Sequence, residues 1–427
     1  MLERIGIASL DELWSSVPAA LRARAELKLA PALAERSLLA HFRERAEQNR
    51  TAANSISFLG AGAYRHFIPS AVDALASRGE FATAYTPYQA EISQGTLQAI
   101  FEFQTLICQL TGLDVANASL YDGASAAAEA ALMALRVTGR RRLLVSAALH
   151  PHYRQVLETC TADLDCSIAT LPLLDDGRTA VESPPDDTAA VLVQYPNVLG
   201  CIEDLRAHAS AAHRAGALLV CVNTEPFALA LLRSPAELGA DLAAGEAQAF
   251  GVPLSFGGPF VGVLAARQKH VRQLPGRLIG ETVDSGGERG FVMTLTTREQ
   301  HIRREKATSN ICTNQGLCAL RVAIYLSLLG RRGVRRLARI NLSLAEYAKG
   351  RLAEAGLRLP YAAPTFNEFV VEVPDLASRY PDMVERGLLP GLPLERLDPE
   401  RRDQLLVCTT ETIGREQIDQ LVRELGA

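Results

Sequence analysis

The chain has 427 residues, of which 48% are hydrophobic, 22% charged and 6% aromatic. This composition is typical of a soluble globular protein with a large core, and it excludes disordered, collagenous and disulfide-stapled classes. The formal net charge is -4, so nothing electrostatic favours nucleic acid or an anionic membrane as partner. No apolar stretch approaches the ~18 residues of a membrane helix. The charged start is unlike a secretory signal, so we expect a cytoplasmic protein.

The residues that usually bind metals or carry thiol chemistry are sparse. None of the eight cysteines forms a Cys-x-x-Cys pair, and several lie in apolar runs, as Cys221 does, which predicts reduced core cysteines. The histidines lack metal-ligand spacing, and His150 and His152 are the only close pair, so we predict no metal site. Lysines are rare: the chain has only Lys28, Lys269, Lys306 and Lys349.

The first part of the chain, 1–56, is expected to be a helical arm. A capping box at 9–12 predicts one short helix, with Trp14 on its apolar side. A second helix is predicted over 31–48, and one of its faces is apolar: Leu38, Leu39 and Phe42. The stretch 57–69 breaks this pattern with glycines and aromatic residues, which indicates an unusual backbone conformation at the start of the main domain.

A large domain is predicted over 57–329, because buried strands alternate with helices there. The expected strands are 143–147, 190–195 and 218–222, and the expected helices include 124–135 and 202–215. This alternation predicts a mainly parallel sheet covered on both faces. Ligands bind such sheets at the carboxyl ends of the strands, where the chain has 150–152, 195–197 and 223–225.

A smaller α+β domain is predicted over 330–427. A long helix at 315–329 leads to a basic run at 331–336, which we interpret as a solvated helix face. The elements expected beyond it are a helix to about 355, strands at 368–373 and 405–408, and a closing helix at 415–425.

Three polar stretches are candidates for chemistry. The stretch 85–95 combines two tyrosines, two glutamines and a glutamate. The stretch 117–125 leads into a helix, where free amides can bind phosphate; Asp122 would repel a phosphate there, so we interpret it as an N-cap. The stretch 245–259 ends in Gly-Gly-Pro, which predicts a close backbone approach.

Together with a fourth stretch, these motifs resemble the glycine decarboxylase P-protein family, and more closely its N-terminal half, a separate subunit in many bacteria. The stretches that carry the resemblance are 85–98, 117–123, 250–259 and 298–313. The resemblance implies the α/β fold of fold-type-I pyridoxal-phosphate (PLP) transferases, with a mainly parallel sheet between helices and a small C-terminal α+β domain. In that family, glycine is decarboxylated and its aminomethyl group passes to the lipoyl arm of the H-protein.

The resemblance also implies that this chain lacks its own cofactor site. PLP needs a lysine amine, and the family's His-Lys-x-Phe-x-x-Pro pattern places Gln248 at the lysine position. Asn223 stands where a carboxylate would meet the pyridine nitrogen. PLP is therefore expected on the partner, subunit 2 of the P-protein, with no covalent cofactor on this chain.

By the same resemblance, active sites lie at a subunit interface and this chain completes the partner's site. The candidates near substrate or channel are Tyr85, Tyr88, Gln89 and Gln94. The candidates near the partner's cofactor are Gly257 and Gly258, at its phosphate, and also Thr308, Ser309 and Asn310. The implied partners are the PLP-bearing subunit in an α2β2 heterotetramer, the lipoyl-bearing H-protein and glycine.

Two other readings stay open. The chain could be a self-sufficient PLP enzyme of this fold, such as an amino-acid decarboxylase or desulfurase, which requires a lysine of its own. Alternatively, it could be a purely structural subunit, in which case changing Tyr85 or Tyr88 would leave turnover of the complex unaffected.

Overall fold

The computed structural model describes residues 1–25, 28–52, 54–82 and 84–426. The chain divides into two compact units, Met1–Asn54 and Ser55–Ala427. Each unit is described by itself.

The first unit consists of short helices without a core. They are α1 (Leu2–Ile5), a 3-10 helix (Leu10–Trp14), α2 (Ala19–Arg24) and α3 (Glu35–Glu47). None of its described residues is buried. The predicted capping box is not formed, because Ser9 makes no side-chain cap and the Glu12 carboxylate accepts instead from the Ala8 amide, at 3.0 Å.

A seven-stranded sheet organises the second unit. Its order is β2-β8-β7-β6-β5-β3-β4, with β2 Val115–Ala116, β3 Arg142–Ser146, β4 Ser167–Leu171, β5 Thr188–Gln194, β6 Leu218–Asn223, β7 Leu242–Glu246 and β8 Gly262–Ala266. The run from β7 to β4 is parallel, while β8 is antiparallel to both its neighbours. The predicted mainly parallel sheet is therefore confirmed.

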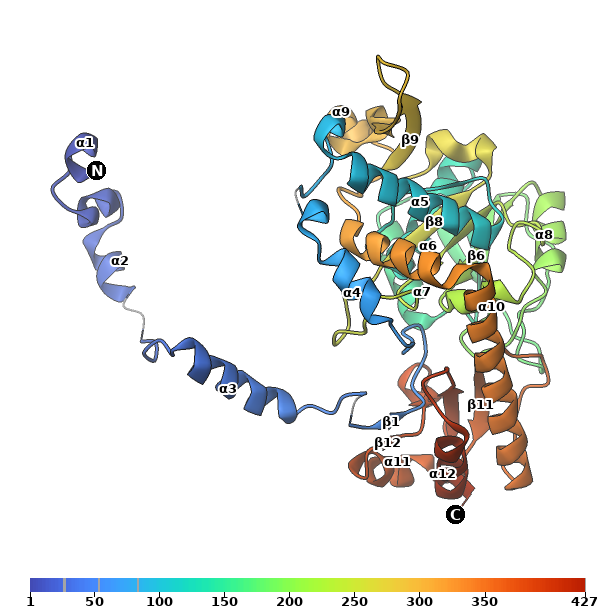
Figure 1. Cartoon of the computed structure of the whole chain (residues 1–427). Helices are drawn as coiled ribbons and strands as arrows, with labels where there is room; N and C mark the ends of the chain where they lie inside the picture. Colours follow the sequence, from blue (N-terminus) through green and yellow to red (C-terminus); the bar gives the residue numbers. More distant parts are fainter. Residues whose placement is uncertain (26–27, 53, 83, 427) are drawn as a thin grey trace. The chain divides into compact units, whose positions relative to one another are not determined.

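Helices cover both faces of this sheet (Figure 1). The covering helices are α5 (Gln94–Thr111), α6 (Gly123–Thr138), α7 (Pro151–Thr161), α8 (Leu205–Arg214) and α10 (Gly316–Glu354). The residues of strand β6 explain why both faces are covered. Val220 and Val222 pack with α6, whereas Leu219 and Cys221 pack with α8. Side chains of a strand alternate between its faces, so a strand that is apolar throughout needs cover on both.

The C-terminal part is reached through α10, which bends at Gly330 (φ 58, ψ 176) where two separate helices were predicted. Beyond it lies a three-stranded sheet of order β11-β14-β13. The elements of this part are β11 Glu368–Glu372, α11 Leu376–Glu385, β12 Leu388–Leu389, β13 Leu392–Pro393, β14 Gln404–Cys408 and α12 Arg415–Gly426. Strand β1 (Ile56–Ser57) pairs with β12. The domain boundaries at 56/57 and 329/330 stay predictions.

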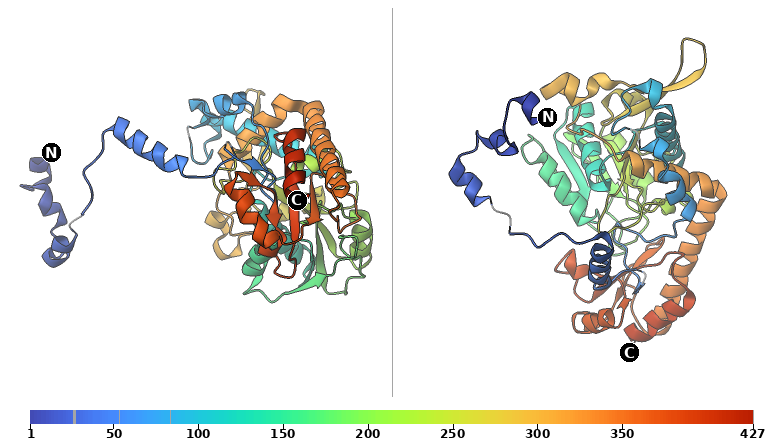
Figure 2. Two further views of the ribbon diagram at one scale, coloured as in Figure 1. Left: turned by 90° about the horizontal axis from the view of Figure 1, so that it is seen from below. Right: turned by 60° about the vertical axis from the view of Figure 1, so that its left-hand side comes forward.

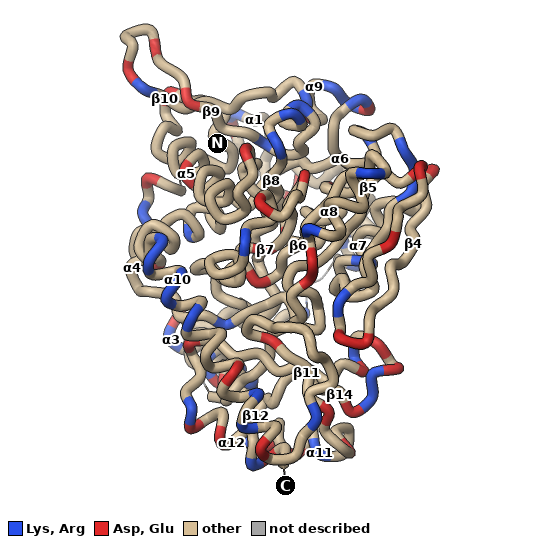
Figure 3. Tube along the Cα trace, turned by 90° about the vertical axis from the view of Figure 1, so that its right-hand side faces the viewer, with Lys and Arg blue, Asp and Glu red and all other residues tan. Residues whose placement is uncertain are grey.

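Several segments lie outside the layers. The hairpin of β9 (Leu278–Val283) and β10 (Arg289–Thr294) projects from the second unit (Figure 2). Helix α4 (Ser70–Ala76) packs beside α10, and the short α9 (Gln300–Arg303) follows the hairpin. Acidic and basic residues alternate along the surface segments in Figure 3, without a face of one sign in that view. Within the described part of the chain, no helix combines the length and the apolar character needed to cross a bilayer.

Candidate functional site: a filled sheet centre and an open groove

Three parallel strands end side by side at the centre of the sheet, as the alternation predicts. Their last residues are Gln194 on β5, Asn223 on β6 and Glu246 on β7. All three side chains are buried. With Gln248, just beyond β7, they form what we call the central cluster.

Gln248, at the position where the family pattern has its lysine, is fully engaged with backbone. Its side-chain oxygen accepts from the Tyr64 amide at 3.0 Å. Its amide group donates to the carbonyls of Tyr64 at 3.1 Å and Val252 at 2.7 Å. Only 2% of the residue is exposed. The glutamine thus serves as a buried clamp that holds the segment around Tyr64 over the strand ends.

Glu246 fills the N-terminus of α6, the place where a phosphate could bind. Its carboxylate accepts from the amides of Gly123 at 2.8 Å and Val261 at 2.7 Å. Burial raises the pKa of Glu246 to about 7. Asp122 accepts from the Ser125 amide at 2.7 Å, so its predicted role as an N-cap is confirmed. Two carboxylates already use the amides that would cradle an anion.

Asn223 is also committed to the protein. Its amide donates to the carbonyls of Tyr195 at 2.7 Å and Glu225 at 3.2 Å. Beside these strand ends, a cavity lined by Asn223, Glu246 and mostly apolar residues of α5 and its neighbours measures about 20 Å³, enough for one water molecule.

The chain's lysines do not supply the missing amine. Lys269 lies 3.7 Å from Asp241, at the opposite end of β7, and Lys349 pairs with Glu346 on α10 at 2.9 Å. Lys28 and Lys306 are exposed. With a glutamine at the lysine position and a carboxylate in the anion cradle, the residues present do not fit PLP. Among the described residues, no group of three or more His, Cys, Asp or Glu side chains is arranged to hold a metal ion.

A second buried network ties the strand ends to the C-terminal part. The Tyr64 hydroxyl donates to Glu368 on β11 at 2.7 Å and lies 3.3 Å from Thr224. Glu368 also accepts from the Ala61 amide at 2.6 Å, and burial raises its pKa to about 7. Gly60 permits this approach, since a Cβ there would lie 2.2 Å from the Glu368 carboxylate. This close contact explains why position 60 in the stretch 57–69 is a glycine.

His66 bridges two carboxylates in the same network. Its Nε2 lies 3.2 Å from Glu225 and its Nδ1 lies 2.9 Å from Glu411. Burial by itself lowers the pKa of His66, but the two carboxylates outweigh burial and raise it to about 9. The imidazolium form is therefore the stable one at neutral pH.

The motif around 85–95 lies, by contrast, at the surface. Tyr85 is 88% exposed and Tyr88 is 61% exposed, and Gln89 is exposed as well. Gln94 differs: its amide donates to the Phe291 carbonyl at 2.9 Å and its oxygen accepts from the Phe291 amide at 2.8 Å. Gln94 thus anchors the start of α5 to β10, while the two tyrosines and Gln89 remain available to another molecule.

Tyr88 borders a groove of about 430 Å³, which we call the Tyr88 groove. It is lined by Tyr88, Glu299, Gln300, His301, Arg304, Glu305, Ile311 and Cys312. The rings of Tyr88 and His301 meet edge to face, with centroids 6.2 Å apart. The fold therefore brings the first and last motifs of the sequence together in one open, polar groove.

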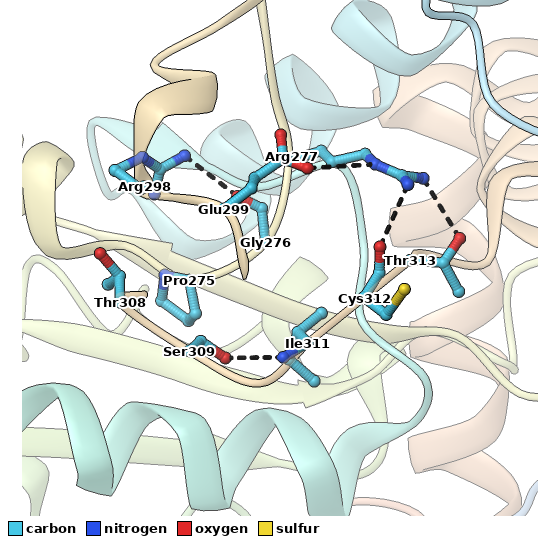
Figure 4. Close-up of a pocket in the computed structure, with 10 residues that line it drawn as sticks. All are labelled: Pro275, Gly276, Arg277, Arg298, Glu299, Thr308, Ser309, Ile311, Cys312 and Thr313. Carbon is cyan, nitrogen blue, oxygen red and sulfur yellow. Dashed lines mark hydrogen bonds and ion pairs between the residues drawn. The ribbon is translucent and has the colours of Figure 1, made fainter. Parts of the chain in front are cut away.

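Arg277, which sequence reasoning missed, contacts both motifs, and Figure 4 shows its bonds to the 312–313 segment. Its guanidinium donates to the Thr313 hydroxyl at 3.1 Å and the Cys312 carbonyl at 3.1 Å, and it lies 5.8 Å from the centroid of the Tyr88 ring. The side chain is only 6% exposed, and its Nε is 4.0 Å from Glu299. Nothing in the local sequence Gly276-Arg277-Leu278 distinguishes this arginine from the chain's many others.

The remaining candidates near a cofactor fall in two places. Thr308 and Ser309 line a hole of about 10 Å³ beside Arg277 (Figure 4), and the Ser309 hydroxyl accepts from the Ile311 amide at 3.0 Å. Asn310 is exposed between them and the groove.

The Gly257–Gly258 turn is strongly bent. Four successive residues have positive φ: Ser255 (44°), Phe256 (58°), Gly257 (112°) and Gly258 (141°). The amides of Gly257 and Gly258 both donate to the Leu254 carbonyl. Phe256, a bulky residue held in this disfavoured conformation, is 85% exposed. Such backbone strain is typical of turns that bind a ligand or a partner.

The sheet, its helical layers and the polar residues at its strand ends define the class: this is the fold of fold-type-I PLP enzymes, in a form whose own centre is filled by protein. A likeness in fold alone links it to sphingosine-1-phosphate lyase of Burkholderia pseudomallei (TM-score 0.63, 17% identity, 94% of this chain and 92% of that one). The predicted fold class is confirmed.

The family model "Glycine cleavage system P-protein" matches residues 1–425. The chain belongs to this family, and the resemblance deduced from its motifs is confirmed. A relative from Sorangium cellulosum, named probable glycine dehydrogenase (decarboxylating) subunit 1, is 50% identical over 100% of this chain and 96% of its own length. A relative of the same name from Anaeromyxobacter dehalogenans is 51% identical over 98% of this chain and 95% of its own.

A solved structure also supports membership of the P-protein family. The crystal structure of a glycine decarboxylase (P-protein) of the glycine cleavage system, in inhibitor-bound form, matches with a TM-score of 0.93 and 45% identity, over 100% of this chain and 96% of that one.

Proposed function

We propose that this chain is subunit 1 of a glycine-decarboxylating P-protein and works only with a PLP-bearing partner, subunit 2. In the complex, glycine loses its carboxyl group and the aminomethyl group passes to the lipoyl arm of the H-protein. The observation that carries the proposal is the contrast within this chain: the central cluster has no amine and its anion-binding amides already bind Glu246, while the Tyr88 groove stays open and polar.

Tyr88 in the groove and its exposed neighbours in the 85–95 motif are proposed to complete the partner's site. Tyr85, Tyr88 and Gln89 offer exposed donors, acceptors and aromatic faces to substrate or to its channel. Preorganised donors of this kind stabilise developing charge and help to exclude water. Gln94 is proposed to act indirectly, because its amide is committed to Phe291.

The cofactor's phosphate is proposed to meet the turn at Gly257 and Gly258. Since both amides already donate to Leu254, the groups available there are the amides of Ser255 and Phe256 on the same turn. Thr308, Ser309 and Asn310 are proposed to lie nearby in the complex, on the segment that Arg277 holds in place.

The proposed assembly is an α2β2 heterotetramer, with glycine as substrate and the lipoyl-bearing H-protein as acceptor. We place it in the cytoplasm, because all eight cysteines of this chain are free thiols, a state that fits a reducing compartment.

Reconstitution tests this function. The chain alone should not release carbon dioxide from glycine, and neither should subunit 2 alone. Mixed with H-protein, the two subunits should do so. Activity of subunit 2 that is unaffected by this chain would contradict the proposal.

A further inference from the structure

A groove of about 640 Å³ lies on the second unit and takes no part in the function proposed above. Helices α5 and α10 both line it, so we call it the α5–α10 groove. Its apolar lining consists of Leu106 and Leu110 on α5, Leu326 and Val334 on α10, and the segment 229–232. The volume falls within the roughly 300–1,000 Å³ that is usual for sites of small molecules.

The groove lies where α10 bends, at Gly330. This glycine lines the groove and has a φ of 58°, a conformation that favours glycine. Apart from its chain neighbours and the adjoining helix backbone, a Cβ here would have no described atom within 4 Å. Figure 1 shows α10 changing direction along its length. Both halves of the helix therefore line one groove, with Leu326 before the bend and Val334 after it.

Two arginines give the apolar groove a charged border. Arg331 and Arg335 both line it, and because they are four residues apart they lie on the same side of α10. Within the part of the chain that the structure describes, neither forms an ion pair, although other arginines of α10 do. Glu237 is the acidic residue of the lining. Part of the basic run 331–336, interpreted from the sequence as a solvated helix face, thus borders an apolar groove.

We propose that the α5–α10 groove binds a free linear aliphatic carboxylic acid. The carboxylate pairs with Arg331 and Arg335, since a guanidinium matches a carboxylate with two parallel hydrogen bonds. The aliphatic chain lies against the leucines and is removed from water. A protein partner fits less well, because a stable protein interface takes about 20–30 residues from each side, whereas fifteen residues line the groove.

Calorimetry of the full chain with decanoate tests the proposal, which does not depend on the function proposed above. We expect one site. Octanoate should bind about 15-fold more weakly, because each buried methylene contributes about fourfold in affinity. Decanol, which has the same chain without the charge, should bind at least about tenfold more weakly than decanoate. Equal binding of decanol and decanoate, or no binding of decanoate up to about 1 mM, would overturn the proposal.

Arginine substitutions locate the carboxylate. The double variant Arg331→Gln, Arg335→Gln should weaken decanoate at least about tenfold and leave decanol within about twofold. The matched control is Arg332→Gln, Arg336→Gln, which removes the same charge from the same helix at positions that do not line the groove. It should leave decanoate within about twofold. All four arginines are exposed, so both variants should keep the melting temperature of the parent chain. Equal losses in the two variants would contradict the proposal.

A third variant locates the aliphatic chain. Ala230 lines the groove and is partly exposed, so Ala230→Phe should fill the groove and abolish the binding of both decanoate and decanol. Unchanged binding by this variant would show that the acid binds elsewhere. If Ala230→Phe lowers the melting temperature, the two arginine variants still decide between the outcomes.

Discussion

The central cluster and the Tyr88 groove use their polar groups in opposite ways. At the sheet centre, Glu246 and Gln248 are each 2% exposed and bonded to backbone amides and carbonyls. At the groove, Tyr88 is 61% exposed, and the Arg277 guanidinium lies 5.8 Å from the centroid of its ring. A buried polar group must satisfy its hydrogen bonds within the protein, so the polar groups of the central cluster stabilise the fold. The groove keeps its groups available for another molecule.

The largest effect is expected from restoring a lysine at the centre. Gln248→Lys removes three hydrogen bonds and buries an ammonium group, so we expect it to lower the free energy of unfolding by roughly 4 kcal/mol. It should bind no PLP, because Glu246 still fills the N-terminus of α6. Denaturant unfolding and PLP absorbance measure the two outcomes. Gln248→Met, which loses the bonds without adding charge, should cost less; a Lys variant that binds PLP stably would show that the centre is not closed.

The pH dependence of stability is a second way to probe the buried network. The pKa of His66 is raised to about 9, from about 6.5 in the unfolded chain. Its contribution is therefore fully present below about pH 6.5 and is lost as the pH rises through about 9, a change of about 3 kcal/mol. Glu246 and Glu368, whose pKa values are raised to about 7, act in the same direction between about pH 4.5 and 7.

Nuclear magnetic resonance of the His66 ring checks this directly. A titration midpoint near 9 is expected, and Glu411→Gln should lower it by removing one of the two carboxylates. A midpoint near 6.5 in the parent chain would contradict the ion-paired arrangement.

In the Tyr88 groove, Tyr88→Ala should lower kcat/KM of the assembled complex about 100-fold, equivalent to about 2.7 kcal/mol of transition-state stabilisation. The complex should still form, as judged by sedimentation. Leu174→Ala, an exposed apolar position away from the motifs, is the control. Unchanged turnover for Tyr88→Ala would support the purely structural subunit.

Arg277 should have a smaller effect that depends on Tyr88. Arg277→Met is expected to lower kcat/KM about tenfold, because the Tyr88 ring and the 312–313 backbone lose their shared support. Combined with Tyr88→Ala, the loss should be less than the product of the two single losses, since both variants remove the same arrangement. Arg277→Lys should recover part of the activity. Multiplicative losses would show that Arg277 acts independently of Tyr88.

Much of the fold could be predicted from the sequence, because β5 and β6 are apolar on both faces except at their ends and so require helices on both sides. The expectation that this chain has no cofactor lysine also came from the sequence, since it concerns one residue, Gln248, at a patterned position, and it stays a prediction. The position of the Glu246 carboxylate at the N-terminus of α6, where an anion could bind, could not be predicted. The reason is that β7 and α6 are separated by more than a hundred residues and only the sheet brings them together. For the same reason Arg277 was missed: the residues that its guanidinium donates to, Thr313 and Cys312, lie 35 or more residues along the chain.

The most direct test of the account is borohydride trapping of PLP on this chain alone and together with subunit 2, followed by peptide mapping. The account predicts that only a lysine of subunit 2 is labelled and that Lys28, Lys269, Lys306 and Lys349 are not. Stoichiometric labelling of any of these four would show that this chain holds the cofactor itself, which would contradict the account and support the self-sufficient enzyme.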